Sequence, residues 1–530
     1  MQKTRLILIL ALLLSLPAGC GDDDDTPADT DAGIRADSGT DGGPSDAGSD
    51  VDAGGDVDAG RDARVDAGSA DLGMDDLGTD AGVTPDAGVM RCPALGDRTI
   101  VDVPEGPLAA GMLRWTCEHI YQLNGVVLVH SADPASPQTL TIEPGTLVRG
   151  NTSATSRGFL VVTRNGHIDA DGTVEDPIVF TSAAAVGTRA RDNWGGLTLL
   201  GRTAAGGTRR TEGFPTAIAS IADLDPYLTY GPVGSAVADE AWDCGTLRHV
   251  RIEFASFNAG GAMGNESNAL QLYSCGTETT IDFVQTHYSG DDGVEIFGGS
   301  VDIRHFVVTG ASDDLFDWDD GWHGRAQFLV GQQFGDAADF GVEAGGGSDT
   351  PTSVPDPRIF NVTLVGSTTA GQIGARLRGA SRGYLRNFVV LGFRDGFFDI
   401  GGAVAAANLA VDPPLLSVRN SIFAQGSAAV AWPSGSDDAA DNDLIEQDFF
   451  SAATQLNRTV DPMLTRPFDT TNPSFVPLAG SPTFAANAET PSERVGDTRP
   501  VFFDTSADYV GAFAPAGIDW TAGWTAYPVN

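Results

Sequence analysis

Lysine is almost absent from this chain: among 530 residues the only one is Lys3. Its absence elsewhere excludes a P-loop lysine, a Schiff-base lysine and a lysine general base, so any cationic catalytic group must be an arginine. Basic residues as a class are few, with 31 Lys and Arg against 72 Asp and Glu and a net charge of −41. Because nucleic acids bind through basic patches, we expect no nucleic-acid partner.

Common catalytic signatures are also missing. We find no GxSxG, no HExxH and no glycine-rich dinucleotide motif ahead of a helix. Cysteine is scarce, with five residues and neither a CxxC motif nor the His/Cys spacing of a zinc site. These absences leave catalysis undecided and favour binding over an enzymatic role.

The first 20 residues read as an export signal. Two basic residues precede the apolar run Leu6–Leu16, which is too short to span a bilayer. The run ends in LPAGC, which resembles a bacterial lipobox, although Pro17 stands where Leu is usual. We therefore expect residues 1–20 to be a lipoprotein signal peptide and Cys20 to carry the lipid; a plain secretory signal is the alternative. The predicted location is the cell envelope, at the outer membrane or cell surface.

Export places the other four cysteines in an oxidising compartment, where disulfides form. Four cysteines allow three pairings, and free buried thiols are a further alternative. Proximity in the sequence favours Cys92–Cys117 and Cys244–Cys275.

Residues 21–90 form a segment of low complexity. The triplet Asp-Ala-Gly recurs in it, and it contains about 20 aspartates, no glutamate and three arginines. It has no aromatic residue and few branched apolar ones, so it cannot offset the entropy of ordering. We expect a disordered, extended tether. A repeated calcium loop is the alternative, but the EF-hand spacing is missing.

From Val126 onward the pattern is typical of strands and turns. Runs such as GVVLVHS, LTIEPGTLVRG and WGGLTLLG alternate with Gly, Asn and Asp, and helical periodicity is scarce. The runs recur at about 22 residues, as between Phe306 and Phe328. This period predicts an all-β, right-handed parallel β-helix over residues 91–425. A sandwich is the alternative, and a propeller would need a period of about 40 to 50 residues.

Two segments depart from the repeat. Residues 203–243 contain RTAAGGTRRTEGFP and LDPYLTYGPVG, which predict a long loop that leaves the helix. The repeats fade after Gly426 into SGSDDAADNDLIEQDFF and a proline-rich tail. Because an open final coil would pair with other chains, we assign residues 426–530 to a C-terminal cap.

Acidic residues recur at the 22-residue interval between Asp291 and Asp339. The segments DDGVE, DDLFD and GDAAD align as one motif on three coils, with Asp291 over Asp313. Equivalent positions in a β-helix lie about 4.8 Å apart, where two charges repel by roughly 3 kcal/mol at an effective dielectric of 20. The alignment predicts two columns of carboxylates: Asp292, Asp314 and Asp336, and Glu295, Asp317 and Asp339.

Such columns can be stabilised in three ways. The acids can be protonated, they can cap turn amides as Asp-Gly pairs commonly do, or a hard cation can bridge them. Calcium is the only cofactor that this pattern suggests, with the six acids as its ligands. Catalytic carboxylates are a further alternative, because paired acids about 5 to 9.5 Å apart hydrolyse glycosidic bonds.

Aromatic and basic side chains surround the acids in the sequence. Flat rings stack on sugars and carboxylates accept hydroxyl protons, so this mixture suits an extracellular polysaccharide. The alternative is that the tryptophans pack under a loop. The candidate ligand-binding residues are Tyr288, Trp318, Trp322, His323 and Arg325.

Several long motifs point to a family. TLRHVRIEFASF, TTIDFVQTHYSGDDGVEIFGG, PRIFNVTLVGS and FFDTSADYVGAFAPAGIDWTAGWT occur in an order that resembles secreted or lipid-anchored bacterial right-handed β-helix repeat proteins. The resemblance covers residues 125–530, and the Asp-Ala-Gly tether is similar to that of myxobacterial lipoproteins. It implies a fold and a location, and no activity.

The segment SGDDGVEIFGG also resembles the Asp-Asp segment of polygalacturonases, which would correspond to Asp291 and Asp292. The other motifs of those enzymes are missing. Pectate lyases use calcium with an Arg or Lys base, for which Arg304 or Arg325 would serve by analogy of fold. We therefore expect a surface lipoprotein that binds polysaccharide, with a lyase or glycoside hydrolase and a purely structural protein as the alternatives.

Overall fold

The computed structural model describes residues 92–204, 209–214, 224–232, 237–258, 266–345, 354–371, 373–425, 446–484 and 488–529. The predicted signal peptide, Cys20 and the predicted tether lie outside these residues. Helices are short throughout the described ranges, and none of them is long and apolar enough to cross a membrane. The 3₁₀ turns are η1 (Leu95–Asp97), η2 (Ala110–Met112), η3 (Asp225–Tyr227) and η4 (Ala453–Gln455).

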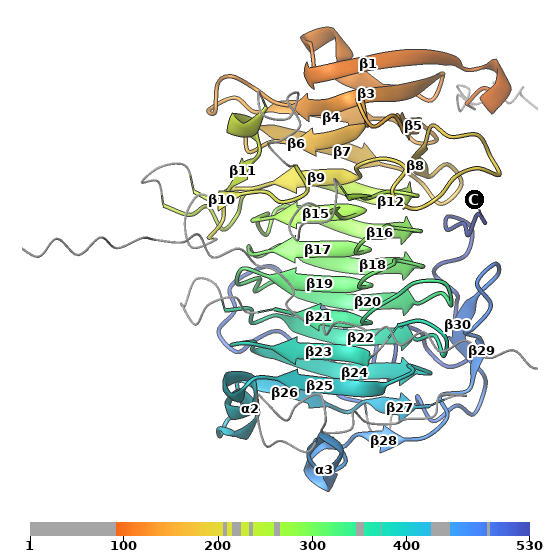
Figure 1. Ribbon diagram of the computed structural model, residues 1–530. Coiled ribbons are helices and arrows are strands. Elements are labelled where there is room, and N and C mark those ends of the chain that lie inside the picture. Colours follow the sequence, from red (N-terminus) through yellow and green to blue (C-terminus); the bar gives the residue numbers. More distant parts are fainter. Residues whose placement is uncertain are drawn as a thin grey trace, which may run out of the picture. The chain divides into compact units, whose positions relative to one another are not determined.

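The body of the protein is a stack of parallel strands (Figure 1). Its 24 strands form one network in which strands pair in parallel with their counterparts on neighbouring coils. This confirms the predicted parallel β-helix. The first coils contain β1 (Thr99–Pro107), β2 (Arg114–Trp115), β3 (His119–Val129), β4 (Gln138–Ile142), β5 (Leu147–Gly150), β6 (Phe159–Val162), β7 (Gly166–Asp171) and β8 (Ile178–Ser182).

Beyond these coils each turn of the helix contributes one short and one long strand. The short-strand stack is β9 (Leu197–Leu200), β15 (Leu270–Tyr273), β17 (Val294–Phe297), β19 (Phe316–Asp319), β21 (Val342–Ala344), β23 (Ile373–Arg378) and β25 (Gly396–Gly401). The long-strand stack is β12 (Gly245–Glu253), β16 (Thr280–His287), β18 (Asp302–Thr309), β20 (Arg325–Gln332), β22 (Arg358–Val365), β24 (Gly383–Leu391), and then β26 (Leu416–Arg419) and β27 (Ile422–Ala424).

Each long strand bends at one residue with a left-handed backbone. Phe283, His305 and Phe328 have φ values of 55°, 47° and 62°, and Asn361 and Asn387 take the same position further along. The three rings stack one coil apart, with centroids 4.2 and 4.8 Å from each other. A positive φ is unfavourable for residues that have a Cβ. Stacking of the rings offsets this cost at the first three positions, and asparagine tolerates the conformation better than most residues at the other two.

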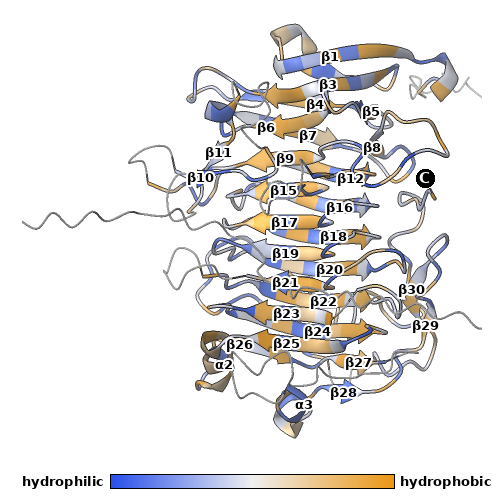
Figure 2. Cartoon of the chain, viewed as in Figure 1, coloured by the Kyte–Doolittle hydropathy of each residue, from blue (hydrophilic) through white to orange (hydrophobic). Residues whose placement is uncertain are grey.

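The core runs the length of the helix as one continuous cluster of inward side chains. In β17 and β19 the inward positions are Val294, Ile296, Phe316 and Trp318, each at most 3% exposed. Figure 2 shows hydrophobic residues concentrated in stacked strands such as β9, β17 and β24. Because strand side chains alternate between faces, the residues between these positions point outward.

The 22-residue period holds only for part of the stack. Thr280 pairs with Asp302, 22 residues later, but Phe306 pairs with Leu329 and not with Phe328. One extra residue before β20 shifts the register, so Phe328 occupies the bend. Longer coils follow, since Arg325 pairs with Arg358.

Both predicted disulfides are present. Cys92–Cys117 and Cys244–Cys275 have Cα–Cα distances of 5.4 and 5.7 Å, within the usual range. The second bridge lies at the base of the segment between β9 and β12. The described parts of that segment contain an antiparallel pair, β10 (Arg209–Arg210) and β11 (Thr229–Tyr230).

Residues after β27 extend the last coil and then leave it. β28 (Arg458–Thr459) pairs in parallel with β27, and Phe450 of α3 (Glu446–Phe450) enters the core. Residues 488–529 then run back along the long strands, so that Ala526 contacts Gln285. The other elements are α2 (Ala403–Ala410), the pair β13 (Phe257–Asn258) and β14 (Glu266–Ser267), and the pair β29 (Leu464–Arg466) and β30 (Ser474–Pro477).

Candidate functional site

An outer column of polar side chains runs along the short-strand stack. Gln271, Glu295, Asp317 and Glu343 occupy equivalent positions on β15, β17, β19 and β21. Their neighbours in each strand are core residues, so the alternation of the strand points these four outward. The column holds three successive carboxylates one coil apart.

The third member of this column corrects the sequence prediction. Asp317 pairs with Glu343, because the coil between β19 and β21 is longer than 22 residues, so Asp339 is not in the column. Asp339 lies in the turn before β21, where its amide donates to the Asp313 carbonyl at 3.0 Å. The predicted position of Asp336 is also wrong.

Asp336 belongs to an ion pair at the surface. Its carboxylate accepts hydrogen bonds from Arg191 at 2.7 and 3.0 Å, and its side chain is 52% exposed. The Arg191 guanidinium holds the pKa of Asp336 below its usual value. An exposed pair of this kind contributes little to stability and leaves Asp336 outside the acidic columns.

An inner column caps the turns that lead into the short strands. Asn268 Oδ1 accepts the Asp292 amide at 3.0 Å, and Asp292 Oδ1 accepts the Asp314 amide at 2.9 Å. Asp314 Oδ1 accepts the Phe340 amide at 2.7 Å. Each side chain thus accepts a hydrogen bond from a backbone amide of the next coil, which is the turn-capping role expected of Asp in such turns. Because Asn268 does this without charge, capping alone does not require carboxylates.

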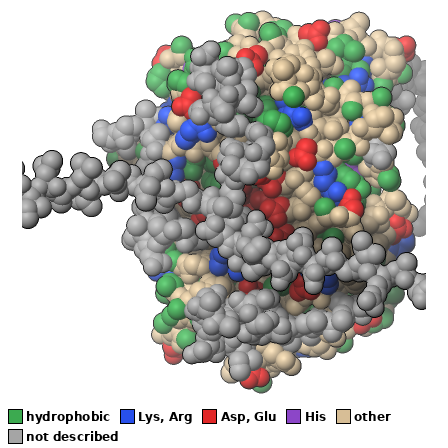
Figure 3. Space-filling model, in the orientation of Figure 1, with side chains coloured by type: hydrophobic (Ala, Val, Ile, Leu, Met, Phe, Trp, Pro, Cys, Tyr) green, Lys and Arg blue, Asp and Glu red, His purple; other side chains and the backbone are tan. Residues whose placement is uncertain are grey.

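The two columns bring carboxylates into three overlapping groups. Within each group the ligand oxygens lie within 4.8 Å of one another. Figure 3 shows Asp and Glu side chains gathered near the middle of this face, at the level of β17 and β19. The groups are Asp291, Asp292 and Asp313; Asp292, Glu295 and Asp317; and Asp314, Asp317 and Glu343.

The protonation of these acids is strongly perturbed. Burial raises the pKa of Asp292, Glu295 and Asp314 well above the usual values, and repulsion from neighbouring carboxylates raises it further. The side chains are 6, 8 and 3% exposed. Neutral pH therefore favours either retained protons or a cation among them.

A hairpin strand from the long segment adds a residue that sequence reasoning missed. Glu212 follows β10, and its Oε1 accepts hydrogen bonds from Asn268 Nδ2 at 3.4 Å and Gln271 Nε2 at 3.3 Å. Its charge contributes to the raised pKa of Glu295. Arg209 of the same strand pairs with Asp320 at the end of β19. No repeat marks Glu212 in the sequence, because it lies outside the coils.

Arginines border the other end of the outer column. Arg378 lies 3.0 Å from Glu343, and Arg376 lies 3.3 Å from Asp399 of β25. Glu343, the last carboxylate of the outer column, therefore has a basic partner. Carboxylate oxygens from several coils are the ligands that hard divalent cations such as calcium prefer, so the residues present fit such an ion.

The predicted sugar-stacking tryptophans are inside the coil. Trp318 and Trp322 are 3 and 1% exposed, lie 5.5 Å apart and belong to the core. The prediction that their ring faces stack on a sugar is wrong, because Trp318 follows outward Asp317 and must point inward. The alternative of packing is the one observed.

The predicted arginines lie on the long strands, away from the acids. Arg325 is 3% exposed and binds Asp302 and Glu493, the latter at 2.8 Å. Arg304 lies over the Phe502 ring at 4.4 Å. Arg325 is therefore enclosed by residues 488–529 and is not available to a ligand, which corrects its assignment to the binding site.

Two predicted ligand residues remain nearer the surface. His323 is paired with Glu240 at 3.1 Å, and this carboxylate helps to raise the pKa of His323. Tyr288 is half-buried, with the Arg191 guanidinium 4.4 Å from its ring centroid. Neither residue contacts the carboxylate groups through a hydrogen bond of the described side chains.

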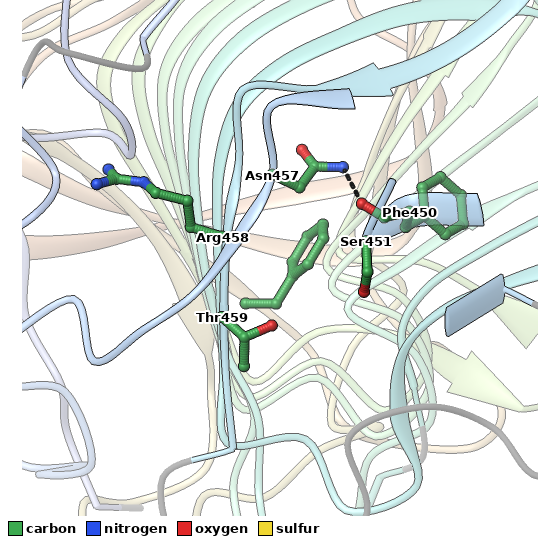
Figure 4. Close-up of a pocket in the computed structure, with 6 residues that line it drawn as sticks. Phe450, Ser451, Asn457, Arg458 and Thr459 are labelled. Atoms are coloured by element: carbon green, nitrogen blue, oxygen red, sulfur yellow. Dashed lines mark hydrogen bonds between the residues drawn. The ribbon is translucent and has the colours of Figure 1, made fainter. Parts of the chain in front are cut away.

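A separate cavity lies at the last coil. It has a volume of about 240 Å³ and is lined by Phe423, Phe450, Ser451, Asn457, Arg458 and Thr459 (Figure 4). Asn457 Nδ2 donates to the Phe450 carbonyl at 3.1 Å. None of its lining residues is a carboxylate, so it shares no residue with the acidic groups.

The stacked coils and their outer carboxylates define a parallel β-helix protein with an outward-pointing, largely buried acidic column. Residues 108–458 match the family described as the pectate-lyase-like β-helix domain, and the chain belongs to this family. The match covers about two thirds of the chain and is compatible with a polysaccharide-related role. Neither the curated proteins nor the solved structures gave a match.

Proposed function

We propose that the protein binds an extracellular polysaccharide and that calcium occupies the acidic groups on β17, β19 and β21. The observation that carries this proposal is the placement of carboxylates on successive coils, with ligand oxygens within 4.8 Å of one another. Calcium takes six to eight oxygen ligands at about 2.3–2.6 Å, including bidentate carboxylates. Asp292, Asp317 and Asp314 each belong to such a group, and their partners are Glu295 and Glu343.

The cation would replace protons. Buried carboxyls with raised pKa values retain their protons to higher pH than exposed ones when no cation is bound, and a divalent ion would displace these protons. A bound cation would leave some coordination positions for hydroxyl or carboxylate oxygens of a sugar. This supports a binding site that depends on calcium.

The location belongs to the same proposal. A lipid at Cys20 would hold the protein in the cell envelope, and the acidic tether of residues 21–90 would space the β-helix from the membrane. The support is the export signal and the composition of the tether. A polysaccharide at the cell surface is then the accessible partner.

A glycoside hydrolase is the second candidate. Its support is the spacing of the carboxylate oxygens, which is close to the separation of about 5 Å in retaining glycosidases. A lyase that uses Arg304 or Arg325 has less support, because those residues pack beneath residues 488–529.

One experiment separates these functions. The full chain with intact disulfides is incubated with acidic and neutral polysaccharides in calcium or in chelator, and retained protein and new chain ends are measured together. Retention that needs calcium and is lost in Asp317→Asn, without new ends, is the expected result. New ends that vanish in this variant would make the protein an enzyme. Retention that persists in chelator and in the variant would contradict the proposal, as would a lack of retention across the panel.

A further inference from the structure

Residues 488–529 form a strap along the outside of the long-strand stack. Four buried amide side chains bind its backbone, and three of them do so with both the oxygen and the nitrogen of the amide. Gln285 pairs in this way with Ala526, Gln327 with Asp504 and Asn387 with Glu489. The fourth, Asn361, donates to the carbonyls of Ala507 and Tyr509.

The first part of the strap, residues 489–504, is held by charge. Glu489 binds Arg386 at 2.9 Å, and Glu493 binds Arg325 at 2.8 Å. Hydrogen bonds from two backbone amides and from Arg325 lower the pKa of Glu493 despite its burial. The ion pair of Glu493 with Arg325 therefore persists in mild acid, because this carboxylate stays ionised.

The last part of the strap, residues 519–529, is held by rings. Trp520 contacts His305 edge to face at 5.1 Å, and Trp524 contacts His249 at 5.9 Å. The His287 Nε2 atom lies 2.9 Å from the Pro528 carbonyl, and Nδ1 lies 2.7 Å from Thr309 Oγ1. Three of the seven histidines of the chain therefore lie under one short segment.

We propose that residues 519–529 are a latch that protonation of His287 and His249 releases from the β-helix in mild acid. The uncharged His287 ring donates from Nε2 to Pro528 and accepts at Nδ1 from Thr309. A second proton removes that acceptor and places a charge in a site that is 1% exposed. The latch would open while residues 489–504 stay bound.

The groups around the two histidines determine whether protonation is favoured or opposed. His287 faces Arg191 and Arg251, which oppose its protonation, together with uncharged Tyr288 and Tyr527. His249 faces Asp171 and Asp282, which favour protonation, and Arg248, which opposes it. Burial outweighs the two aspartates.

The pKa values are in accord with this geometry. Burial lowers the pKa of His287 to about 4 and lowers that of His249. Because the pKa of His287 is lower in the closed latch than in the open one, the uncharged ring stabilises the closed latch fully at pH values above about 6.5, the ordinary histidine pKa. This stabilisation is lost as the pH falls from about 6.5 towards 4. If the open latch restores the ordinary pKa, His287 alone changes the opening equilibrium by up to about 300-fold.

The test is hydrogen exchange of the full chain between pH 7 and 4, corrected for intrinsic exchange. The amides of residues 524–529 should lose protection by about 100-fold between pH 7 and 4, while those of residues 489–504 should lose much less. His287→Gln retains a donor for Pro528 and cannot titrate, so its latch should lose much less protection at pH 4 than that of the wild type, with His249 as the remaining titrating group. The matched control His323→Gln, at a half-buried histidine that pairs with Glu240 and, within the described part of the chain, makes no ring contact with residues 519–529, should behave as the wild type.

Two outcomes would overturn the latch. One is full protection of residues 524–529 in the wild type at pH 4, and the other is an equally steep loss in His287→Gln. If the Gln variant is already open at pH 7, His249→Phe replaces it, since Phe fits the ring stack with Phe283. This variant should lose less protection than the wild type, and an unchanged loss counts against the proposal.

Discussion

Replacement of Asp314 by asparagine separates the two roles of the inner column. Asp314 caps the Phe340 amide, and Asn268 shows that an amide oxygen can make the same kind of contact. Asp314→Asn should therefore keep the cap and remove one charge from the group with Asp317 and Glu343. The expected effect on stability has opposite signs with and without calcium.

The magnitude follows from the spacing. Two carboxylates about 4.8 Å apart repel by about 3.5 kcal/mol at an effective dielectric of 20. Proton uptake by carboxyls of raised pKa relieves much of this repulsion, so we expect Asp314→Asn to stabilise the chelated protein by about 1 kcal/mol. In calcium the wild type should gain about 2.7 kcal/mol at 100 times its dissociation constant, and the variant should lose most of this gain.

Thermal melts of both proteins, in calcium and in chelator at pH 7, measure the effect. Each kcal/mol corresponds to about 2 °C for a chain of this size. Asp314→Ala is the matched control, because it removes the cap as well and should destabilise under both conditions. If Asp314→Asn has the same effect on the melting temperature in calcium as in chelator, the charge of Asp314 plays no part in calcium binding and the reasoning is refuted.

Three further predictions concern the pH dependence of calcium binding, one disulfide and one buried ion-pair network. The difference in melting temperature between calcium and chelator should grow as the pH rises from 4 to 7, because raised carboxyl pKa values favour the folded state only while the groups are protonated; a difference independent of pH would contradict this. Cys244→Ser with Cys275→Ser should cost about 3.5 kcal/mol in denaturant titrations, since the bridge closes a 31-residue separation, and a loss below about 1 kcal/mol would mean that the bridge constrains little. Arg325→Met should cost about 3–5 kcal/mol by leaving Glu493 without its cation and Asp302 with only the more distant Arg499, and Arg325→Lys should recover part of it in the same assay.

The architecture could be predicted from the sequence because the coils repeat. Regular runs of strand residues predict the parallel β-helix, and the 22-residue coil predicts the pairing of Glu295 with Asp317. The same rule fails for Asp336 and Asp339, because the next coil is longer and brings Glu343 into register. Loop length is not encoded in the strand pattern, so the register has to come from the structure.

The burial of Trp318 and the contribution of Glu212 were not predicted from the sequence, for different reasons. The burial of Trp318 could have been inferred, since it alternates with outward Asp317 in a strand. Glu212 could not, because it reaches the acids from a hairpin outside the repeat. Contacts of this kind join segments that share no periodic pattern.

The return path of residues 488–529 has a consequence for how the chain folds. Coils pair with neighbours a few tens of residues away, whereas Gln285 and Ala526 are 241 residues apart. Contacts of high sequence separation close slowly, because their loop entropy is lost before the contact forms. The coils can therefore stack one after another while the buried amides of Gln285, Gln327, Asn361 and Asn387 await their partners. Folding should show a fast phase of stacking and a slow phase that ends only when the strap has docked.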